Sequence, residues 1–330
     1  MTSPNVTFLG NVPTAVATTA LTFDPDAPIA YVSTFGGLQI FDIADPTSPR
    51  PLAVLPINGF TNESFELGVR PGGKKFVLFG ANAVAADSTG YVKPQQRVVT
   101  VVEVTDPRQP RVVAHLETPT RTHTVTCLDR PACTFAYTDG RTADEAGGFE
   151  PSGTIIDLRD YEHPVVAGVF SSVVPRAHQN DLDEAGVMWR SGQEGTVALD
   201  ISDPLAPKQL NSTDDDGVGE GGGDFPNPSG EGNIEEIVQP HHHNSTRPYA
   251  QNFVPGAPPD IFAGNVLLVT EELIFVDSQR CPTGGKEGRF QAWYIPFLDA
   301  DRYQRLNPGG VPGGGTIRLL STWNTELLDT

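Results

Sequence analysis

The sequence predicts an all-β fold of the β-propeller class, built from four-stranded antiparallel blades. Two observations predict it. A β-rich run closed by the phrase Asp-x-x-x-Pro occurs four times, and the aspartates of successive phrases are 61, 54 and 43 residues apart. Apolar and polar residues alternate between the phrases, whereas helical periodicity is nearly absent. Repeats of roughly 40–60 residues that each hold several short strands are typical of propellers.

The repeated phrase predicts a tight turn between the third and the fourth strand of each unit. An aspartate at the start of such a turn accepts hydrogen bonds from the turn backbone, and the proline fixes φ where the chain leaves it. The four phrases run from Asp45 to Pro49, Asp106 to Pro110, Asp160 to Pro164 and Asp203 to Pro207.

Alternation and turn signals divide the first half of the chain into three units of four strands. The strands expected in the first unit are residues 19–23, 29–34, 37–43 and 51–57. Those of the second unit are residues 63–69, 74–81, 97–104 and 111–117. Those of the third unit are residues 122–128, 134–140, 153–159 and 165–171.

Two further units follow, so that the chain holds about five. The strands expected in the fourth unit are residues 178–184, 186–192, 195–201 and 208–213. Those of the fifth are residues 243–249, 265–272, 289–295 and 317–323. The blades are expected to end near residues 57, 117, 171, 211 and 323.

We expect residues 1–330 to form a single propeller domain with one insertion. Residues 211–240 are acidic and rich in glycine, which predicts a long loop between the fourth and fifth units. Residues 6–12 resemble a fourth strand that would complete the last blade of a ring. No unit follows the fifth to receive that strand, which predicts a larger ring in a protein that continues past Thr330. Alternatively, residues 6–12 pair at a sheet edge, or the ring closes with fewer blades.

The charge of the chain excludes some classes of partner. The formal net charge is −19 at pH 7, and such a surface repels nucleic acid and anionic membranes. No apolar run of about 18 residues is present, so no membrane-spanning helix is expected. The expected partner is a small molecule or a protein ligand at a face of the propeller.

Two of the three cysteines are placed to form a disulfide. Cys127 and Cys133 flank a short turn between two expected strands, so they can meet across a hairpin. A disulfide there indicates an oxidising compartment, with Cys281 left over. The alternative is a pair of reduced thiols in a cytosolic protein.

Three segments of the chain are similar to bacterial LVIVD-repeat β-propeller proteins. They are GLQIFDIADPTSPR, GTVALDISDPLAP and the closing LLVTEE…GRFQAWYI. The resemblance implies a propeller that is usually exported, to the periplasm, the cell surface or the medium, and often has seven blades. The family mostly lacks assigned biochemistry, so the resemblance bears on fold and location more than on activity.

Four polar residues share one position of the repeat, counted from the turn proline. Glu63 lies 14 residues after Pro49, His123 lies 13 residues after Pro110, and His178 lies 14 residues after Pro164. His243 is placed by a second count, because it lies three residues after Pro240 just as His178 lies three residues after Pro175. The first strand of each blade lines the central channel of a propeller, so these four side chains are expected to converge on the axis.

The four residues are those that a transition metal accepts as ligands. Imidazole and carboxylate bind iron, copper and zinc, so Glu63, His123, His178 and His243 predict a metal site of unknown metal. Glu66, Asn180, Asp181 and Asn244 are candidates for the hydrogen bond to each second imidazole nitrogen. The alternative is a set of polar side chains that fill a wet channel. His115 and His163 are expected on the outer side of the blades.

Three functions are consistent with these features. We favour an exported acidic propeller that binds a metal ion or a small ligand at the axial His/Glu ring. The first alternative is a metal-dependent oxidoreductase or oxygenase that uses the same ring as its catalytic centre. The second alternative is a protein-interaction scaffold with an inert channel. Fold alone does not decide among them.

Overall fold

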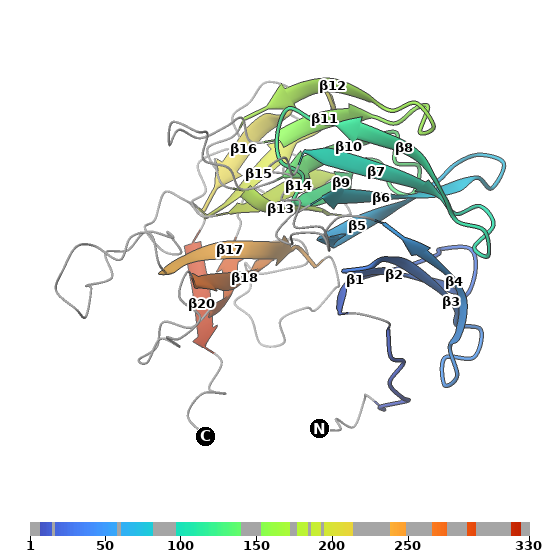
Figure 1. The fold of residues 1–330 in the computed structure, drawn as a ribbon. Coiled ribbons are helices and arrows are strands. Elements are labelled where there is room, and N and C mark those ends of the chain that lie inside the picture. Colours follow the sequence, from blue (N-terminus) through green and yellow to red (C-terminus); the bar gives the residue numbers. More distant parts are fainter. Residues whose placement is uncertain are drawn as a thin grey trace. The chain divides into compact units, whose positions relative to one another are not determined.

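Five four-stranded antiparallel sheets make up the chain in this computed structural model (Figure 1). In each sheet the four strands lie side by side in chain order, which is the meander of a propeller blade. We number the sheets blade 1 to blade 5 along the chain. The described residues contain strands and turns but no helix, and the predicted all-β, β-propeller class is confirmed.

The structure describes most of the first three blades and the strands of the last two. The described ranges are 7–14, 17–57, 61–81, 97–139, 153–171, 177–183, 186–192, 195–213, 238–248, 266–275, 289–294 and 318–324. No helix in them is long and apolar enough to cross a membrane.

The strands are short, as expected for blades. Blade 1 holds β1 (Thr18–Phe23), β2 (Ile29–Thr34), β3 (Gly37–Asp42) and β4 (Arg50–Pro56). Blade 2 holds β5 (Thr61–Val69), β6 (Lys75–Ala81), β7 (Val98–Glu103) and β8 (Arg111–Glu117). Blade 3 holds β9 (Thr124–Cys127), β10 (Phe135–Asp139), β11 (Gly153–Asp157) and β12 (Val165–Phe170). Blade 4 holds β13 (Ala177–Leu182), β14 (Val187–Gly192), β15 (Gly195–Asp200) and β16 (Lys208–Ser212). Blade 5 holds β17 (Val238–Thr246), β18 (Val266–Phe275), β19 (Arg289–Tyr294) and β20 (Arg318–Asn324).

The predicted blade ends are confirmed, whereas the predicted start of β17 and the strand predicted at residues 6–12 are wrong. The fourth strands end within one residue of the predicted positions, at Pro56, Glu117, Phe170, Ser212 and Asn324. β17 begins at Val238 and not at 243, because Pro240 is tolerated on an edge strand, where its missing N–H breaks no ladder. Residues 7–14 form no strand, since Gly10 and Pro13 both disfavour one.

Strands extend into both ends of the loop that was predicted at residues 211–240. β16 extends to Ser212 and β17 begins at Val238, because the ladder with the neighbouring strand continues at each end. Residues 214–237 lie outside the described part of the chain.

The chain divides into two compact units. The first, residues 1–140 and 153–169, holds blades 1 to 3 up to the last residue of β12. The second, residues 141–152 and 170–330, holds Phe170, the last residue of β12, together with blades 4 and 5.

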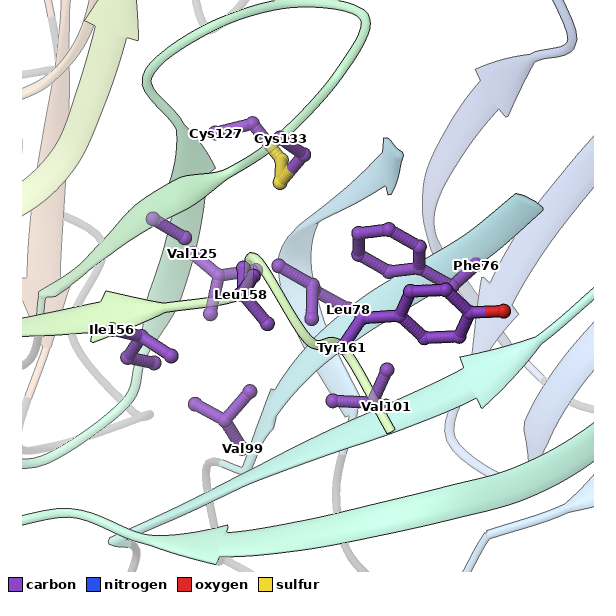
Figure 2. Packing of buried hydrophobic residues seen from close by; sticks show 11 residues of the cluster. Phe76, Leu78, Val99, Val101, Val125, Cys127, Cys133, Ile156, Leu158 and Tyr161 are labelled. Carbon is purple, nitrogen blue, oxygen red and sulfur yellow. A yellow bond between two sulfur atoms is a disulfide. The ribbon is translucent and has the colours of Figure 1, made fainter. Parts of the chain in front are cut away.

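Apolar side chains are buried between successive blades of each unit. One cluster joins blades 2 and 3, where Phe76 stacks on Tyr161 with ring centroids 4.5 Å apart (Figure 2). A second cluster joins blades 1 and 2 and includes Tyr31 and Phe79. In the second unit, Trp189 of blade 4 and Trp293 of blade 5 belong to one cluster. Within each unit, successive blades therefore bury their faces against each other, as blades of a propeller do.

The Asp-x-x-x-Pro turns have the hydrogen bonds that the sequence predicts. Asp45 Oδ1 accepts from Thr47 Oγ1 at 2.6 Å and from the Thr47 backbone N–H at 2.9 Å. These bonds, led by that from the Thr47 side chain, hold the pKa of Asp45 below its ordinary value. The same backbone bond recurs from Arg108 to Asp106, from Glu162 to Asp160 and from Leu205 to Asp203. The turn is thus a local structure that the repeated phrase encodes.

The predicted disulfide joins Cys127 and Cys133, with a Cα–Cα distance of 4.9 Å. Both residues are fully buried at the edge of the cluster between blades 2 and 3 (Figure 2). Cys281 lies outside the described residues. The bridge ties the end of β9 to the turn that leads into β10.

The disulfide makes a prediction about free thiols. We expect unreduced protein from an oxidising compartment, unfolded in denaturant, to contain one free thiol, because only Cys281 of the three cysteines is outside the bridge. Ellman titration measures this. Prior reduction should raise the count to all three, and three thiols in the unreduced sample would contradict the bridge.

Candidate functional site

In four blades the first strand contains a β-bulge. The register shifts between Thr18 and Ala20 in β1, and between Thr61 and Phe65 in β5. It also shifts between Ala177 and Gln179 in β13, and between His242 and Asn244 in β17. A bulge adds a residue outside the ladder and re-aims its side chain. We call this added residue the bulge residue.

The bulge residues include the predicted site residues. His178 is the bulge residue of β13 and His243 that of β17, while Thr19 takes this place in β1. Glu63 falls within the shifted segment of β5, and its side chain lies outside the described part of the chain. Two of the predicted site residues, His178 and His243, thus occupy the same bulge position in different blades.

His123 takes the equivalent position in blade 3, although it lies outside the strand. β9 begins at Thr124, two residues after the predicted start at residue 122, and Thr124 pairs with Asp139. His178 likewise directly precedes Gln179, which pairs with Ser191. His123 is partly buried, and it belongs to the first unit.

The structure brings two of the four residues together. The imidazole rings of His178 and His243 lie 4.1 Å apart, centroid to centroid, with 37° between their planes. His178 is 1% exposed and His243 is half-buried. The rings meet because β17 packs against both β13 and β14. Two successive blades of the second unit thus place their bulge imidazoles in contact.

His242 is a site residue that sequence reasoning missed. It is fully buried, and its Nδ1 lies 2.8 Å from Thr196 Oγ1 of blade 4. Its ring lies edge-on to Trp293, with centroids 6.2 Å apart. His242 thereby anchors β17 to blade 4 directly beside His243. The signal was in the sequence, because three consecutive histidines necessarily present imidazoles to more than one side of a strand.

Polar contacts continue between blades 4 and 5. Asp181 Oδ2 accepts a hydrogen bond from the Ser245 backbone N–H at 2.8 Å, and Gln179 Nε2 donates to Asp181 Oδ1 at 3.0 Å. Asn244 accepts from the Thr270 hydroxyl within blade 5. Asp181 and Asn244, two of the predicted partners for the imidazoles, therefore fix the strands that hold His178 and His243.

The other two predicted partners form different contacts. Glu66 forms an ion pair with Arg130, and Asn180 Oδ1 lies 3.5 Å from an Arg190 guanidinium nitrogen. The guanidinium of Arg190 also lies over the Phe170 ring, 4.9 Å from its centroid.

The two histidines expected on the outer side have contacts of their own. His163 Nδ1 lies 3.0 Å from Asp160 Oδ2, with the His163 side chain 81% exposed. His115 Nδ1 lies 3.0 Å from Thr100 Oγ1. The exposed His163 is therefore a suitable control for experiments on the bulge histidines.

The described residues do not themselves assemble a complete metal site. Within the described ranges, no group of three or more His, Cys, Asp or Glu side chains is arranged to hold a metal ion. His123 belongs to one unit and the His178–His243 pair to the other. The four-residue set and its metal, whether iron, copper or zinc, thus stay a prediction.

Comparison with solved structures bears on the fold. The chain is similar to a protein from Lactobacillus plantarum, with a TM-score of 0.52 and 9% identity over 92% of this chain and 70% of that one. For the β-propeller domain of Cps50 (Swd1) from Myceliophteria thermophila the TM-score is 0.48 and the identity is 12%, over 95% of this chain and 73% of that one. For the periplasmic gluconolactonase of Pseudomonas aeruginosa the TM-score is 0.47 and the identity is 11%, over 92% of this chain and 69% of that one. At 9% identity the similarity to the Lactobacillus plantarum protein bears on the fold alone.

Sequence comparison adds no family. No protein-family model matches the chain, and no curated protein matches it in sequence.

Proposed function

We propose that the chain is an exported acidic β-propeller that binds a transition-metal ion, or a small ligand, at the bulge residues of its first strands. The ligand set is His123, His178 and His243 with Glu63. The observation that carries the proposal is the contact of the His178 and His243 rings, 4.1 Å apart, on equivalent bulges of successive blades. Paired imidazoles on two adjacent first strands supply the nitrogen donors that iron, copper and zinc bind.

Two further features support parts of this proposal. The Cys127–Cys133 disulfide supports export, because such bridges persist in oxidising compartments. The repeated strand-and-turn phrase supports membership of the LVIVD-repeat proteins, which we propose as the family.

Metal titration of protein without a His tag tests the site. We expect isothermal titration calorimetry with Zn²⁺, Cu²⁺ or, without oxygen, Fe²⁺ to detect about one tight site per chain. His178→Ala and His243→Ala each remove one ligand, and we expect each to weaken the affinity more than about 100-fold, beyond the usual effect of losing an outer partner.

The matched control is His163→Ala, which removes an exposed histidine bonded to Asp160. It should leave the affinity unchanged. Equal affinity in the wild type and both bulge variants would refute the site. A wild-type chain that binds none of the three metals would leave the interaction scaffold as the better function, and metal-dependent oxidation of a substrate would favour the enzyme.

A further inference from the structure

Two buried hydroxyl groups of blade 4 lead to the imidazole of His242 in blade 5. Ser191 Oγ lies 3.0 Å from Thr196 Oγ1, and Thr196 Oγ1 lies 2.8 Å from His242 Nδ1. Ser191 and Thr196 pair across β14 and β15, and all three side chains are fully buried. A hydrogen-bonded series thus runs from one blade into the first strand of the next.

The backbone of Thr196 is fixed independently of its side chain. The Thr196 N–H donates to Thr213 Oγ1 at 2.9 Å, and the Thr196 carbonyl accepts from the Thr213 backbone N–H at 2.9 Å. The hydroxyl of Thr196 is therefore presented to His242 from a fixed position. Its removal should leave the pairing of β15 with β16 intact.

Counting donors gives the direction of the two hydrogen bonds. Each hydroxyl has one hydrogen to donate, and an imidazole nitrogen either carries a hydrogen or accepts one. If Ser191 donates to Thr196 and Thr196 donates to His242 Nδ1, both buried hydroxyl hydrogens are bonded. In the opposite direction the Ser191 hydrogen would have no acceptor, because within the described ranges Ser191 Oγ bonds only to Thr196. A buried donor without an acceptor costs free energy, which favours the first direction.

This direction gives adjacent histidines different tasks. Nδ1 of His242 accepts a hydrogen bond, so the neutral ring carries its hydrogen on Nε2 and neither nitrogen has a lone pair left for a metal ion. His242 pairs with Glu271 at the last ladder position before the bulge of β17. His243, the bulge residue itself, lies against His178.

We infer that Thr196 is a positioning residue for the proposed metal site. Together with Ser191 it holds His242 as the Nε2–H tautomer. His242 in turn holds β17 to blade 4 beside the bulge, so that His243 and not His242 is the ligand. The tautomer needs no metal, whereas the positioning role rests on the proposed function.

Three variants of the full chain test the tautomer. Thr196→Val keeps the shape of threonine without its hydroxyl, Thr196→Ser keeps the hydroxyl, and Ser191→Ala leaves the Thr196 oxygen able to accept from an Nδ1–H. Long-range ¹H–¹⁵N spectra of histidine-labelled protein report each tautomer, with His242→Gln assigning the His242 signal. We expect the Nε2–H pattern in the wild type and in Thr196→Ser. We expect a mixture of both tautomers in Thr196→Val and in Ser191→Ala.

The matched control is Thr100→Val, because Thr100 Oγ1 lies 3.0 Å from His115 Nδ1 in blade 2. It removes a hydroxyl from a second threonine–histidine pair, and it should change the signal of His115 but not that of His242. An Nδ1–H pattern of His242 in the wild type, or an unchanged His242 signal in folded Thr196→Val, would overturn the inference.

Metal titration tests the positioning role. With Zn²⁺ we expect the nitrogen signals of His178 and His243 to shift, while His242 keeps its Nε2–H pattern. The affinity measured by calorimetry should fall about 10-fold in Thr196→Val, the lower end of the usual effect of losing an outer partner. Thr196→Ser should retain the wild-type affinity. Loss of the His242 Nε2–H on addition of Zn²⁺, or equal affinity in Thr196→Val and the wild type, would refute the positioning role.

The two measurements separate this inference from the proposed function. If His242 shows the expected tautomers but the wild type binds none of the three metals, the tautomer assignment stands and the proposed function fails. If the wild type binds metal but His242 does not respond to Thr196→Val, the proposed function stands and the inference fails.

Discussion

Replacing Asp183 with alanine is expected to lower the free energy of unfolding by about 3–5 kcal/mol, the usual cost of breaking a buried ion pair. Asp183 Oδ2 lies 3.0 Å from Arg247 Nε, and the two side chains are 1% and 0% exposed. The same oxygen accepts from Trp189 Nε1 at 2.7 Å, and Asp183 Oδ1 accepts from the Val187 backbone N–H at 3.0 Å. Loss of the carboxylate leaves a buried guanidinium and two buried donors behind.

Urea denaturation followed by tryptophan fluorescence measures this loss. Arg159→Ala is the control, because it removes an ion pair in which the arginine is 70% exposed, and the urea midpoint should hardly move. The double variant Asp183→Leu with Arg247→Met should recover much of the stability, because apolar side chains often replace a buried pair without cost. Equal midpoints for Asp183→Ala and the wild type would show that the pair contributes nothing.

Replacing Gly37 with alanine is expected to destabilise blade 1 by about 3 kcal/mol or more, from backbone strain and overpacking together. Gly37 begins β3 at φ +123°, a conformation that side chains rarely adopt. An added Cβ would lie 2.2 Å from the Leu55 carbonyl oxygen and 2.6 Å from the Ile57 nitrogen. Both atoms belong to the backbone, so neither moves without distorting β4.

Gly72→Ala is the matched control for Gly37→Ala. Gly72 also has a positive φ, +84°, but nothing lies within 4 Å of its added Cβ. This variant should cost about 1 kcal/mol from backbone strain alone. Thermal and urea unfolding of both variants should therefore differ clearly. Equal stabilities would mean that β4 yields to the methyl group at no cost.

Most of the fold could be predicted from the sequence because its signals are local. The Asp-x-x-x-Pro phrase forms its turn with its own backbone, as the bonds of Asp45 to Thr47 show, so each occurrence marks the end of a third strand. The blade ends followed from these turns. The start of β17 was missed because residues 211–240 were assigned to a loop, although an edge strand tolerates Pro240.

The candidate site was harder to predict, because it depends on how strands pair. The repeat position of His178 and His243 could be counted along the chain. The bulge that re-aims their side chains, however, can be seen only from the residues that pair between the first and second strands. His242 was missed for the same reason, since a bulge decides which of two adjacent histidines faces Thr196.

The bulge also has a consequence for how such chains diverge. The bulge residue lies outside the ladder that holds its blade together, so its replacement removes none of the hydrogen bonds between strands. Thr19, His178 and His243 already show that different chemistries fit this place. A single codon change per blade can therefore alter the set of donors, while the sheets keep their pairing. Selection, natural or in the laboratory, can therefore exchange the side chains at the bulges one blade at a time and retain the scaffold throughout.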